Sequence, residues 1–194
     1  MPKNYGEMPP DAVRRPDREV TDQTWIRDFL HRATTGYLAT VYEDQPFINS
    51  NLYVYDEANS RIYMHTARVG RTRANIETSE KVCFSISEVG RMLPADEALE
   101  FSVEYSGVVI FGSACVVTDA DEQRHGLQLL LDKYFSHLRP GEHYRPIDDS
   151  ELVRTSVYRI DIERWTGKQK KAEADFHGAF LYQENRRDES NPLP

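Results

Sequence analysis

The feature that most constrains the fold is one long β-rich run, EFSVEYSGVVIFGSACVVT, which extends from Glu100 to Thr118. Valine, isoleucine and aromatic residues dominate this run, and these residue types are enriched in strands. Two glycines interrupt it, Gly107 and Gly112, where we expect β-bulges or sharp bends of the kind found in barrels. The run therefore predicts a long strand in a sheet that curls on itself.

Shorter β-rich segments surround this run and alternate with only three helical patterns. The predicted strands cover residues 37–42, 46–56, 61–66, 81–89 and 152–165, and the predicted helices cover 21–34, 70–79 and 119–138. No strand–helix–strand repetition is present, so we expect an α+β or closed-barrel arrangement rather than a parallel sheet. A small antiparallel barrel would also leave few of these short strands with an exposed edge.

Residues at the ends of the helical patterns supply start and stop signals. Thr21 is the predicted N-cap of the first helix, and Gly36 stops that helix. Asp119 and Glu122 have the spacing of a capping box at the start of the third helix. Pro140 is expected to end the third helix.

The composition narrows the classes of protein and partner. The 194 residues carry a formal net charge of -8, which argues against general nucleic-acid binding, because that function favours basic surfaces. No apolar run approaches the roughly 20 residues that span a bilayer, and the N-terminus lacks the apolar core of a signal peptide. We therefore expect a cytoplasmic protein with no membrane partner. Cys83 and Cys115 lie in separate apolar runs and are expected to be buried, reduced thiols.

The segment YMHTARVGRTRANI, from Tyr63 to Ile76, concentrates hydrogen-bond donors and cations in an acidic chain. It places Thr66, Arg71 and Arg73 around a predicted helix start at Gly70. Helix N-termini attract anions, and arginine suits bidentate phosphate binding. The pattern suggests a phosphate site. It lacks the spacing of a P-loop, however, and ordinary surface arginines at a solvated helix start are the alternative.

The longer stretch IYMHTARVGRTRANIETSEKVCFSISEVG resembles the pyridoxamine 5'-phosphate oxidase-like, FMN-binding split-barrel superfamily. Within that superfamily it is most similar to the nitroimidazole-resistance (Nim-type) branch. Four further stretches carry the resemblance: TTGYLATVY, PFINSNLYVYD, SVEYSGVVIFGSACVV and RTSVYRIDIERWTGK. It implies a mainly β (α+β) fold, a six-stranded antiparallel Greek-key split β-barrel with flanking helices. It also implies a homodimer that holds the flavin at the subunit interface.

The resemblance covers nearly the whole folded part and leads us to expect three regions. An extended N-terminal arm takes residues 1–20, and the split-barrel flavin-binding domain takes residues 21–172. A polar C-terminal tail takes residues 173–194. Prolines among charged residues in the arm, and the polar composition of the tail, agree with this division.

The resemblance also assigns contacts to the phosphate of FMN. The phosphate-binding segment of the family corresponds here to Thr66, Arg71 and Thr72, with Arg73 as a helper. Many flavin-binding relatives carry lysine where this chain has Thr72, so one positive charge is missing at that position.

Further contacts are implied for the flavin ring and the substrate. The segment INSN matches the strand that runs along the ring, which makes Asn49, Ser50 and Asn51 the expected contacts of its polar edge. Lys168, in the motif WTGK, is expected to reach the cofactor or the partner subunit. His65 lies where Nim-type proteins carry a histidine associated with the active site. It is the expected catalytic residue and would donate a proton or hydrogen bond to a small-molecule substrate; a structural histidine is the alternative.

Three functions follow from these expectations. The first is an FMN-dependent oxidoreductase that reduces a small electrophile such as a nitro-aromatic compound. The second is a non-catalytic flavin- or haem-binding module, in which His65 or His177 would bind haem; related barrels also use deazaflavin. Oxidation of pyridoxamine phosphate is the least expected, because His177, Arg186 and Arg187 do not have the arrangement found in the oxidases.

Overall fold

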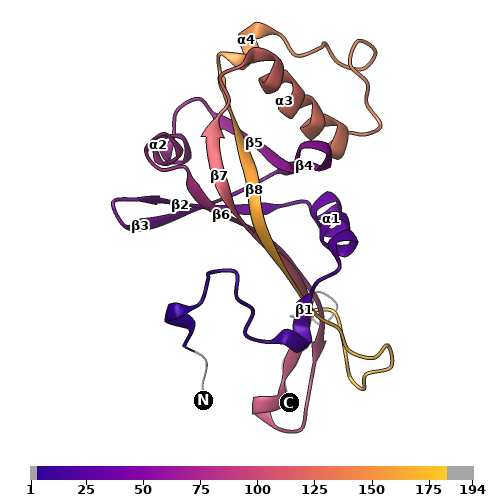
Figure 1. Ribbon diagram of the computed structural model, residues 1–194. Coiled ribbons are helices and arrows are strands. Elements are labelled where there is room, and N and C mark those ends of the chain that lie inside the picture. Colours follow the sequence, from indigo (N-terminus) through magenta and orange to yellow (C-terminus); the bar gives the residue numbers. More distant parts are fainter. Residues whose placement is uncertain (1–3, 183–194) are drawn as a thin grey trace, which may run out of the picture.

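The computed structural model describes residues 4–182 and consists of one antiparallel sheet with helices packed against it (Figure 1). The strands are β1 (Glu19–Val20), β2 (Gly36–Tyr42), β3 (Gln45–Asn51), β4 (Tyr53–Asp56), β5 (Arg61–Ala67), β6 (Lys81–Leu93), β7 (Ser102–Val116) and β8 (Thr155–Lys170). The helices are α1 (Gln23–Arg32), α2 (Arg71–Thr78), α3 (Ala120–Tyr134) and α4 (Asp149–Leu152), with short 3-10 turns at Tyr5–Glu7, Pro16–Arg18, Glu57–Asn59 and Ala98–Glu100. A mainly β fold with flanking helices is therefore confirmed, with eight strands rather than six.

The sheet order, β3-β2-β6-β7-β8-β5-β4 with β1 on β8, explains the additional strands. The segment predicted as a single strand, 46–56, divides at Leu52 into β3 and β4, which lie at opposite ends of this order. The side-chain oxygen of Asn51 accepts a hydrogen bond from the backbone N–H of Leu52 at 2.8 Å and fixes the corner. β3 and β4 follow one another in the chain but lie at the two edges of the sheet. The sheet therefore curls into a barrel, and the chain at Leu52 connects its two edges. The eighth strand, Glu19–Val20, comes from the expected N-terminal arm.

The long strand predicted from the sequence is β7, which pairs with β6 on one side and β8 on the other. Its register with β8 shifts at Gly112. A Cβ atom at Gly112 would lie 2.2 Å from the carbonyl oxygen of Asp161, so glycine is required for this close approach. Gly107 pairs in register with both neighbouring strands, and no bulge forms at that position.

The cap of α1 differs by one residue from the prediction. Its N-cap is Asp22 rather than Thr21, because the Asp22 carboxylate accepts hydrogen bonds from the backbone N–H groups of Thr24 and Trp25. The backbone carbonyl oxygen of Thr21 instead accepts a hydrogen bond from the Gln23 side-chain amide. Aspartate is thus the residue that satisfies the first orphan donors of this helix.

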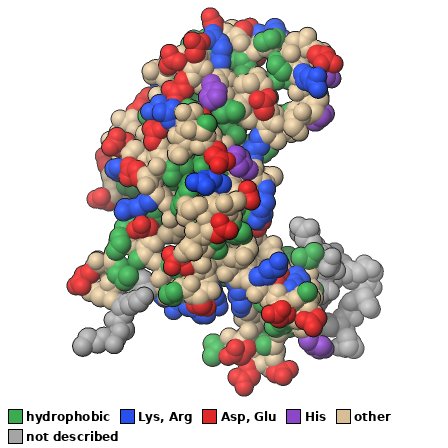
Figure 2. Space-filling model, turned by 45° about the vertical axis from the view of Figure 1, so that its right-hand side comes forward, with side chains coloured by type: hydrophobic (Ala, Val, Ile, Leu, Met, Phe, Trp, Pro, Cys, Tyr) green, Lys and Arg blue, Asp and Glu red, His purple; other side chains and the backbone are tan. Residues whose placement is uncertain are grey.

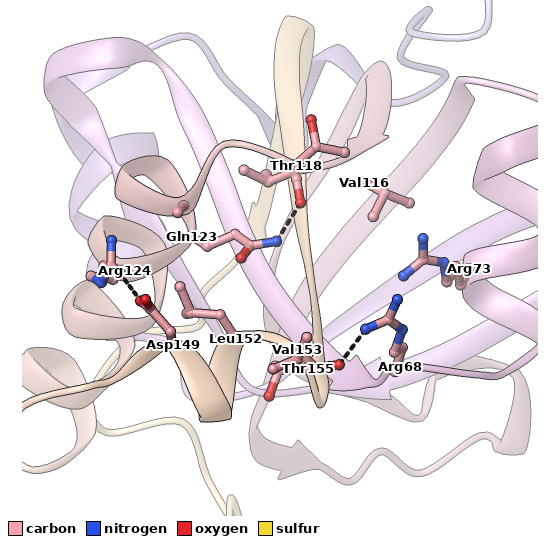
Figure 3. A pocket seen from close by; sticks show the side chains of 12 residues that line it. Arg68, Arg73, Val116, Thr118, Gln123, Arg124, Asp149, Leu152, Val153 and Thr155 are labelled. Carbon is pink, nitrogen blue, oxygen red and sulfur yellow. Dashed lines mark hydrogen bonds and ion pairs between the residues drawn. The ribbon is translucent and has the colours of Figure 1, made fainter.

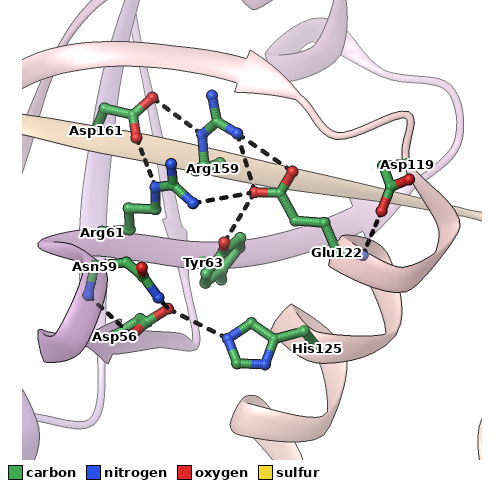
Figure 4. A network of polar contacts seen from close by, with 9 residues as sticks. All are labelled: Asp56, Asn59, Arg61, Tyr63, Asp119, Glu122, His125, Arg159 and Asp161. Carbon is green, nitrogen blue, oxygen red and sulfur yellow. Dashed lines mark hydrogen bonds and ion pairs between the residues drawn. The ribbon is translucent and has the colours of Figure 1, made fainter.

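The start of α3 shows only half of the predicted capping box. Asp119 accepts a hydrogen bond from the backbone N–H of Glu122 at 2.8 Å. The reciprocal bond is missing, because the Glu122 carboxylate instead accepts from Tyr63 and Arg159 (Figure 4). The helix ends at Tyr134, before the predicted stop at Pro140.

The packing of the helices leaves one end of the barrel for a site. α3 lies over β4 and β5, whereas α2 packs against β2 and β7 (Figure 1). Fully buried side chains fill the barrel between them: Phe29, Leu38, Tyr53, Ile62, Met64, Phe84, Ile110 and Ile160. The end of β5, the start of α2 and the start of β8 therefore meet at the same end of the barrel.

The opposite end of the molecule is a projecting hairpin formed by the end of β6 and the start of β7 (Figure 1). Figure 2 shows a lobe set apart at the lower end of the molecule. Arg91 forms an ion pair with Glu104 at 2.8 Å and donates to the carbonyl oxygens of Glu173 and Ala174, both at 2.9 Å. These bonds hold the chain that follows β8 against the hairpin. The predicted tail continues to residue 194, and its residues 183–194 lie outside the described part.

Candidate functional site

The expected phosphate site lies where β5 passes into α2. Gly70 is the N-cap of α2 and supplies no side-chain acceptor for the first backbone N–H groups of the helix. Arg71 follows at the first helical position, is exposed, and lies 5.0 Å from the ring centre of Tyr42. No carboxylate of residues 4–182 forms an ion pair with Arg71. The predicted helix start is confirmed, and it presents donors and one unpaired cation.

Two asparagines of β3 connect that strand to the β5–α2 segment. The Asn49 amide donates to the hydroxyl of buried Thr72 at 3.2 Å, and the Asn51 amide donates to the carbonyl oxygen of His65 at 2.6 Å. The expected contacts of the ring and of the phosphate are thus brought together. Ser50 is not among them, because successive strand residues point to opposite faces and Ser50 is exposed on the other one.

The remaining polar groups of the phosphate segment already have protein partners. The Thr66 hydroxyl bonds the Tyr158 hydroxyl at 2.7 Å and donates to the carbonyl oxygen of Ala67 at 2.9 Å. Arg73 pairs with Glu77 at 2.7 Å and donates to the Ser156 hydroxyl at 3.0 Å. Thr66 is therefore less available to a ligand than Arg71.

Lys168 lies apart from this group in the single chain. It is opposite Gly107 and Glu19 in the sheet, whereas Thr66 is opposite Ser156 near the other end of β8. At about 3.3 Å per residue, roughly 40 Å of strand separates the two positions. A contact between Lys168 and the same cofactor therefore requires a second copy of the chain.

His65 lines an apolar cavity of about 230 Å³, here called the histidine cavity. Its other lining residues are Leu52, Leu127, Leu130, Leu131, Tyr134, Phe135, Ile147, Glu151 and Thr155. The Nδ1 atom of His65 is buried and has no hydrogen-bond partner within residues 4–182. Burial lowers the pKa of His65 below its ordinary value, so its imidazole is neutral at pH 7. The sequence predicted the apolar face of α3, but gave no signal that this face would line a cavity beside His65.

A second cavity, of about 380 Å³, lies between the start of α3 and the arginines that follow β5, and is here called the arginine cavity (Figure 3). Arg68 and Arg73 line one side of it, and Gln123, Arg124, Asp149 and Leu152 line the other. Val116, Val117, Thr118, Ala120, Val153 and Thr155 complete the lining. These residues come from α2, β7, α3, α4, β8 and the loops beside them, and among them the sequence assigned an expected role only to Arg73.

The described residues contain neither a cluster suited to a metal ion nor a helix suited to a membrane. Among residues 4–182, no group of three or more His, Cys, Asp or Glu side chains is arranged to hold a metal ion. In the same part of the chain, no helix has the length and apolar character needed to cross a membrane.

The curled antiparallel sheet with its flanking helices defines a split β-barrel. The chain belongs to the pyridoxamine 5'-phosphate oxidase family, since a family model of that description matches residues 22–169. The resemblance noted in the sequence is therefore confirmed. A comparison with curated protein sequences gives no match.

Several solved structures share this fold. The flavocytochrome Anf3 from Azotobacter vinelandii is 18% identical with a TM-score of 0.71, and the match covers 94% of this chain and 92% of that one. The FAD and haem binding protein from Mycobacterium smegmatis is 18% identical with a TM-score of 0.70, covering 80% and 74%. A proposed 5-nitroimidazole antibiotic resistance protein from Bacteroides thetaiotaomicron is 17% identical with a TM-score of 0.64, covering 78% and 86%.

Proposed function

We propose that the protein binds a flavin between β3, β5 and α2 and uses it to reduce a small electrophile. The observation that carries this proposal is the pair of hydrogen bonds from Asn49 to Thr72 and from Asn51 to the carbonyl of His65. They hold the strand expected along the ring against the segment expected at the phosphate. Membership of the family, and similarity to proteins described as flavin-binding, support the same class of cofactor.

The side chains present fit the flavin mononucleotide group. Arg71 and the first backbone N–H groups of α2 would bind its phosphate. The side-chain oxygen of Asn49 has no partner within residues 4–182 and would accept a hydrogen bond from the ring. A bound flavin accepts electrons from a donor and passes them to an acceptor.

The histidine cavity would hold the electrophile. It is lined mainly by leucine and aromatic side chains, so it favours a neutral compound with an apolar ring, such as a nitro-aromatic compound. His65 would donate a hydrogen bond to this compound through its neutral imidazole as the compound is reduced.

A homodimer is part of this proposal. Large apolar side chains are exposed on the β2–β3 hairpin and its corner, namely Tyr37 (44%), Val41 (42%), Ile48 (65%) and Leu52 (42%). A second subunit that covered this surface would bury them and would bring its own Lys168 within reach of the flavin. Light scattering during gel filtration tests this point, and a monomer of 22.5 kDa would contradict it.

The alternative is a flavin- or haem-binding module without catalysis. It is supported by the neighbours described as a flavocytochrome and as an FAD and haem binding protein. The histidine cavity is less favourable to haem, because about 230 Å³ suits a compound with a single ring better than a large macrocycle. Absorbance spectroscopy separates the two cofactors, since haem adds an intense Soret band.

The decisive experiment titrates the apo-protein with FMN and follows quenching of flavin fluorescence. We expect micromolar or tighter binding, weakened at least tenfold in Arg71→Ala. Arg27→Ala is the control, because Arg27 is a partly exposed arginine on α1 that pairs with Glu57 and is not among the expected flavin contacts. Absence of binding to FMN, FAD and a deazaflavin would overturn the proposal.

Turnover then separates the enzyme from the binding module. With NADH or NADPH as donor and a nitro-aromatic acceptor, the wild type is expected to be active, and His65→Gln is expected to lose most of that activity while it retains bound flavin. Equal rates in wild type and His65→Gln would remove the catalytic role of His65. A flavin-loaded wild type without turnover would favour the binding module.

A further inference from the structure

The arginine cavity has no role in the proposed reaction, yet it has the properties of a ligand site. Its volume of about 380 Å³ falls within the range typical of small-molecule pockets. It is far larger than a single phosphate or sulfate ion needs. Its lining comes from several elements that are distant in sequence, so the folded barrel assembles it (Figure 3).

One side of this cavity is cationic and preorganised. Arg68 donates to the carbonyl oxygen of Val153 at 2.6 Å and forms no ion pair with any carboxylate of residues 4–182. Arg73 lies beside it (Figure 3). The hydroxyl of Ser156, a buried residue, accepts from Arg73 at 3.0 Å and donates to the carbonyl oxygen of Arg68 at 3.2 Å. The Arg73 side chain and the Arg68 backbone are thereby fixed to the start of β8. Arg73 also pairs with Glu77 at 2.7 Å, so the charge left for an anionic group is mainly that of Arg68.

The other side combines apolar and hydrogen-bonding groups. Leu152 and Val116 offer apolar surface to a flat ring. The Gln123 amide donates to the carbonyl oxygen of Val117 at 2.7 Å, which leaves its own side-chain oxygen available to an amino or hydroxyl group. Asp149 lies at the same side and is paired with Arg124. An anion that carries a ring with polar edges matches both sides of the cavity.

Position links this cavity to the expected flavin phosphate. Arg68 and Arg73 also line a neighbouring cavity with Val69, Gly70, Ala74 and Glu77 at the start of α2. Arg71, on the first turn of the same helix, contacts Tyr42 instead, on the side of β2. A diphosphate that passed the start of α2 would therefore meet Arg71 on one side and Arg73 on the other.

We infer that the arginine cavity binds the adenosine monophosphate group of a dinucleotide, supplied by FAD or by a nicotinamide dinucleotide. The inference rests on the proposed flavin function for the choice of adenosine, because both dinucleotides of flavin oxidoreductases carry that group. The phosphate meets Arg68 and Arg73, and the adenine ring lies between Leu152, Val116 and Gln123. The single-phosphate end of FMN would leave this cavity unused.

The test compares ligands and matched variants on the apo-protein. FAD, FMN and NADH are titrated by fluorescence, and AMP is added as a competitor. For FAD as the source, we expect FAD to bind at least tenfold more tightly than FMN, and Arg68→Gln to remove that difference while it leaves FMN affinity within twofold. Val153→Trp, which fills the cavity from an exposed position, should act in the same way. Arg154→Gln is the control, since Arg154 is an exposed neighbour outside the lining.

The outcomes separate this inference from the flavin proposal. One supporting outcome is equal affinity for FAD and FMN together with NADH binding that is displaced by AMP and weakened by Arg68→Gln. This outcome assigns the cavity to the nicotinamide dinucleotide. Equal affinity for FAD and FMN without that displacement overturns the inference and leaves the flavin proposal intact. Failure of both flavins to bind overturns the flavin proposal. In that case the inference survives only if AMP displaces NADH from the wild type and does not do so in Arg68→Gln. Any other result overturns the inference as well.

Discussion

Two groups of arginines lie at opposite ends of β5, and they differ in how their charges are neutralised. The paired group, at the start of the strand, joins Arg61 to Asp161 at 2.9 Å and Arg159 to Glu122 at 3.0 Å (Figure 4). Tyr63 donates to the same Glu122 carboxylate at 2.9 Å, and burial together with this bond raises the pKa of Tyr63 to about 12. Each cation there has a carboxylate, so the group connects β5, β8 and α3.

The unpaired group, after the end of β5, consists of Arg68 and Arg71. Both are exposed, and within residues 4–182 neither has a carboxylate partner. Arg68 donates to the backbone carbonyl of Val153, and Arg71 lies over the ring of Tyr42. These cations remain available to an anion from solution, whereas those of the paired group do not. The comparison separates arginines that stabilise the fold from arginines that are placed to bind, and it predicts opposite effects of substitution.

The largest effect is expected when the paired group is broken. Glu122→Ala would leave Arg61, Arg159 and Tyr63 without their shared acceptor in a partly buried position, and should lower the free energy of unfolding by about 3 kcal/mol. Urea denaturation followed by circular dichroism measures this loss. Asp121→Ala, one residue earlier on the exposed surface of α3, is the control and should change stability by less than about 0.5 kcal/mol. A similar stability for both variants would contradict a structural role for the paired group.

A third kind of cation sharpens the comparison. Lys133 is partly buried, donates to the carbonyl oxygen of Ala33 at 2.8 Å and lies 3.9 Å from the ring centre of Tyr53. Burial lowers the pKa of Lys133 to about 8 in the folded protein, whereas the unfolded chain keeps the ordinary value near 10.5. Between these values the unfolded state binds more protons, so this group makes stability rise with pH from about 8 to 10.5.

Lys133→Met should remove that contribution. We expect wild-type stability to gain about 1–2 kcal/mol more than the variant between pH 7 and pH 9.5. Urea midpoints measured across this range give the difference, and comparison with the variant cancels the other titrating groups. Parallel pH profiles for the two proteins would show that Lys133 is not held at a lowered pKa.

The opposite result is expected from the unpaired group. Arg71→Ala should weaken flavin binding about tenfold to thirtyfold, which corresponds to about 1.4–2 kcal/mol, because a charge-assisted phosphate contact is lost. Its free energy of unfolding should stay within about 0.5 kcal/mol of wild type. Arg71→Lys keeps the charge and should recover part of the affinity. A stability loss without a binding loss would place Arg71 with the structural arginines.

The smallest effect is expected at Ser156, which positions the Arg73 side chain and the backbone of Arg68 in the unpaired group. Ser156→Ala removes the hydroxyl that contacts both Arg68 and Arg73, so FAD affinity should fall about threefold and the free energy of unfolding by about 1 kcal/mol. Fluorescence titration and urea denaturation measure the two quantities. Ser150→Ala, at an exposed serine of α4, is the control. An unchanged FAD affinity in Ser156→Ala would show that the arginines are positioned without this hydroxyl.

The sequence predicted those parts of the fold that depend on local pattern. The long strand β7, the β4–β5 hairpin and α3 follow from residue type and periodicity over short distances. The break at Leu52 could not be found in this way, because both sides of it are β-rich and the break is imposed by closure of the barrel. Closure depends on contacts between distant segments, which a single sequence does not reveal.

The site was predicted less completely than the fold, for a related reason. Asn49, Asn51 and Thr72 lie in motifs that carry a family resemblance, and the structure bonds Asn49 to Thr72 and Asn51 to the carbonyl of His65. Lys168 also lies in such a motif, but the length of β8 places it far from the others. The arginine cavity draws single residues from many elements, so none of its members carries a local signal.

β8 is the last strand of residues 4–182, yet it lies between β7 and β5 in the middle of the sheet. During synthesis, the strands before it would leave the ribosome as two separate pieces, β3-β2-β6-β7 and β4-β5, each with an unpaired edge. Completion of the barrel would wait for residues 155–170, and the nascent chain would meanwhile depend on chaperones to keep those edges from aggregating. Because Ser156 arrives with this strand, the ligand sites would form in the same late step.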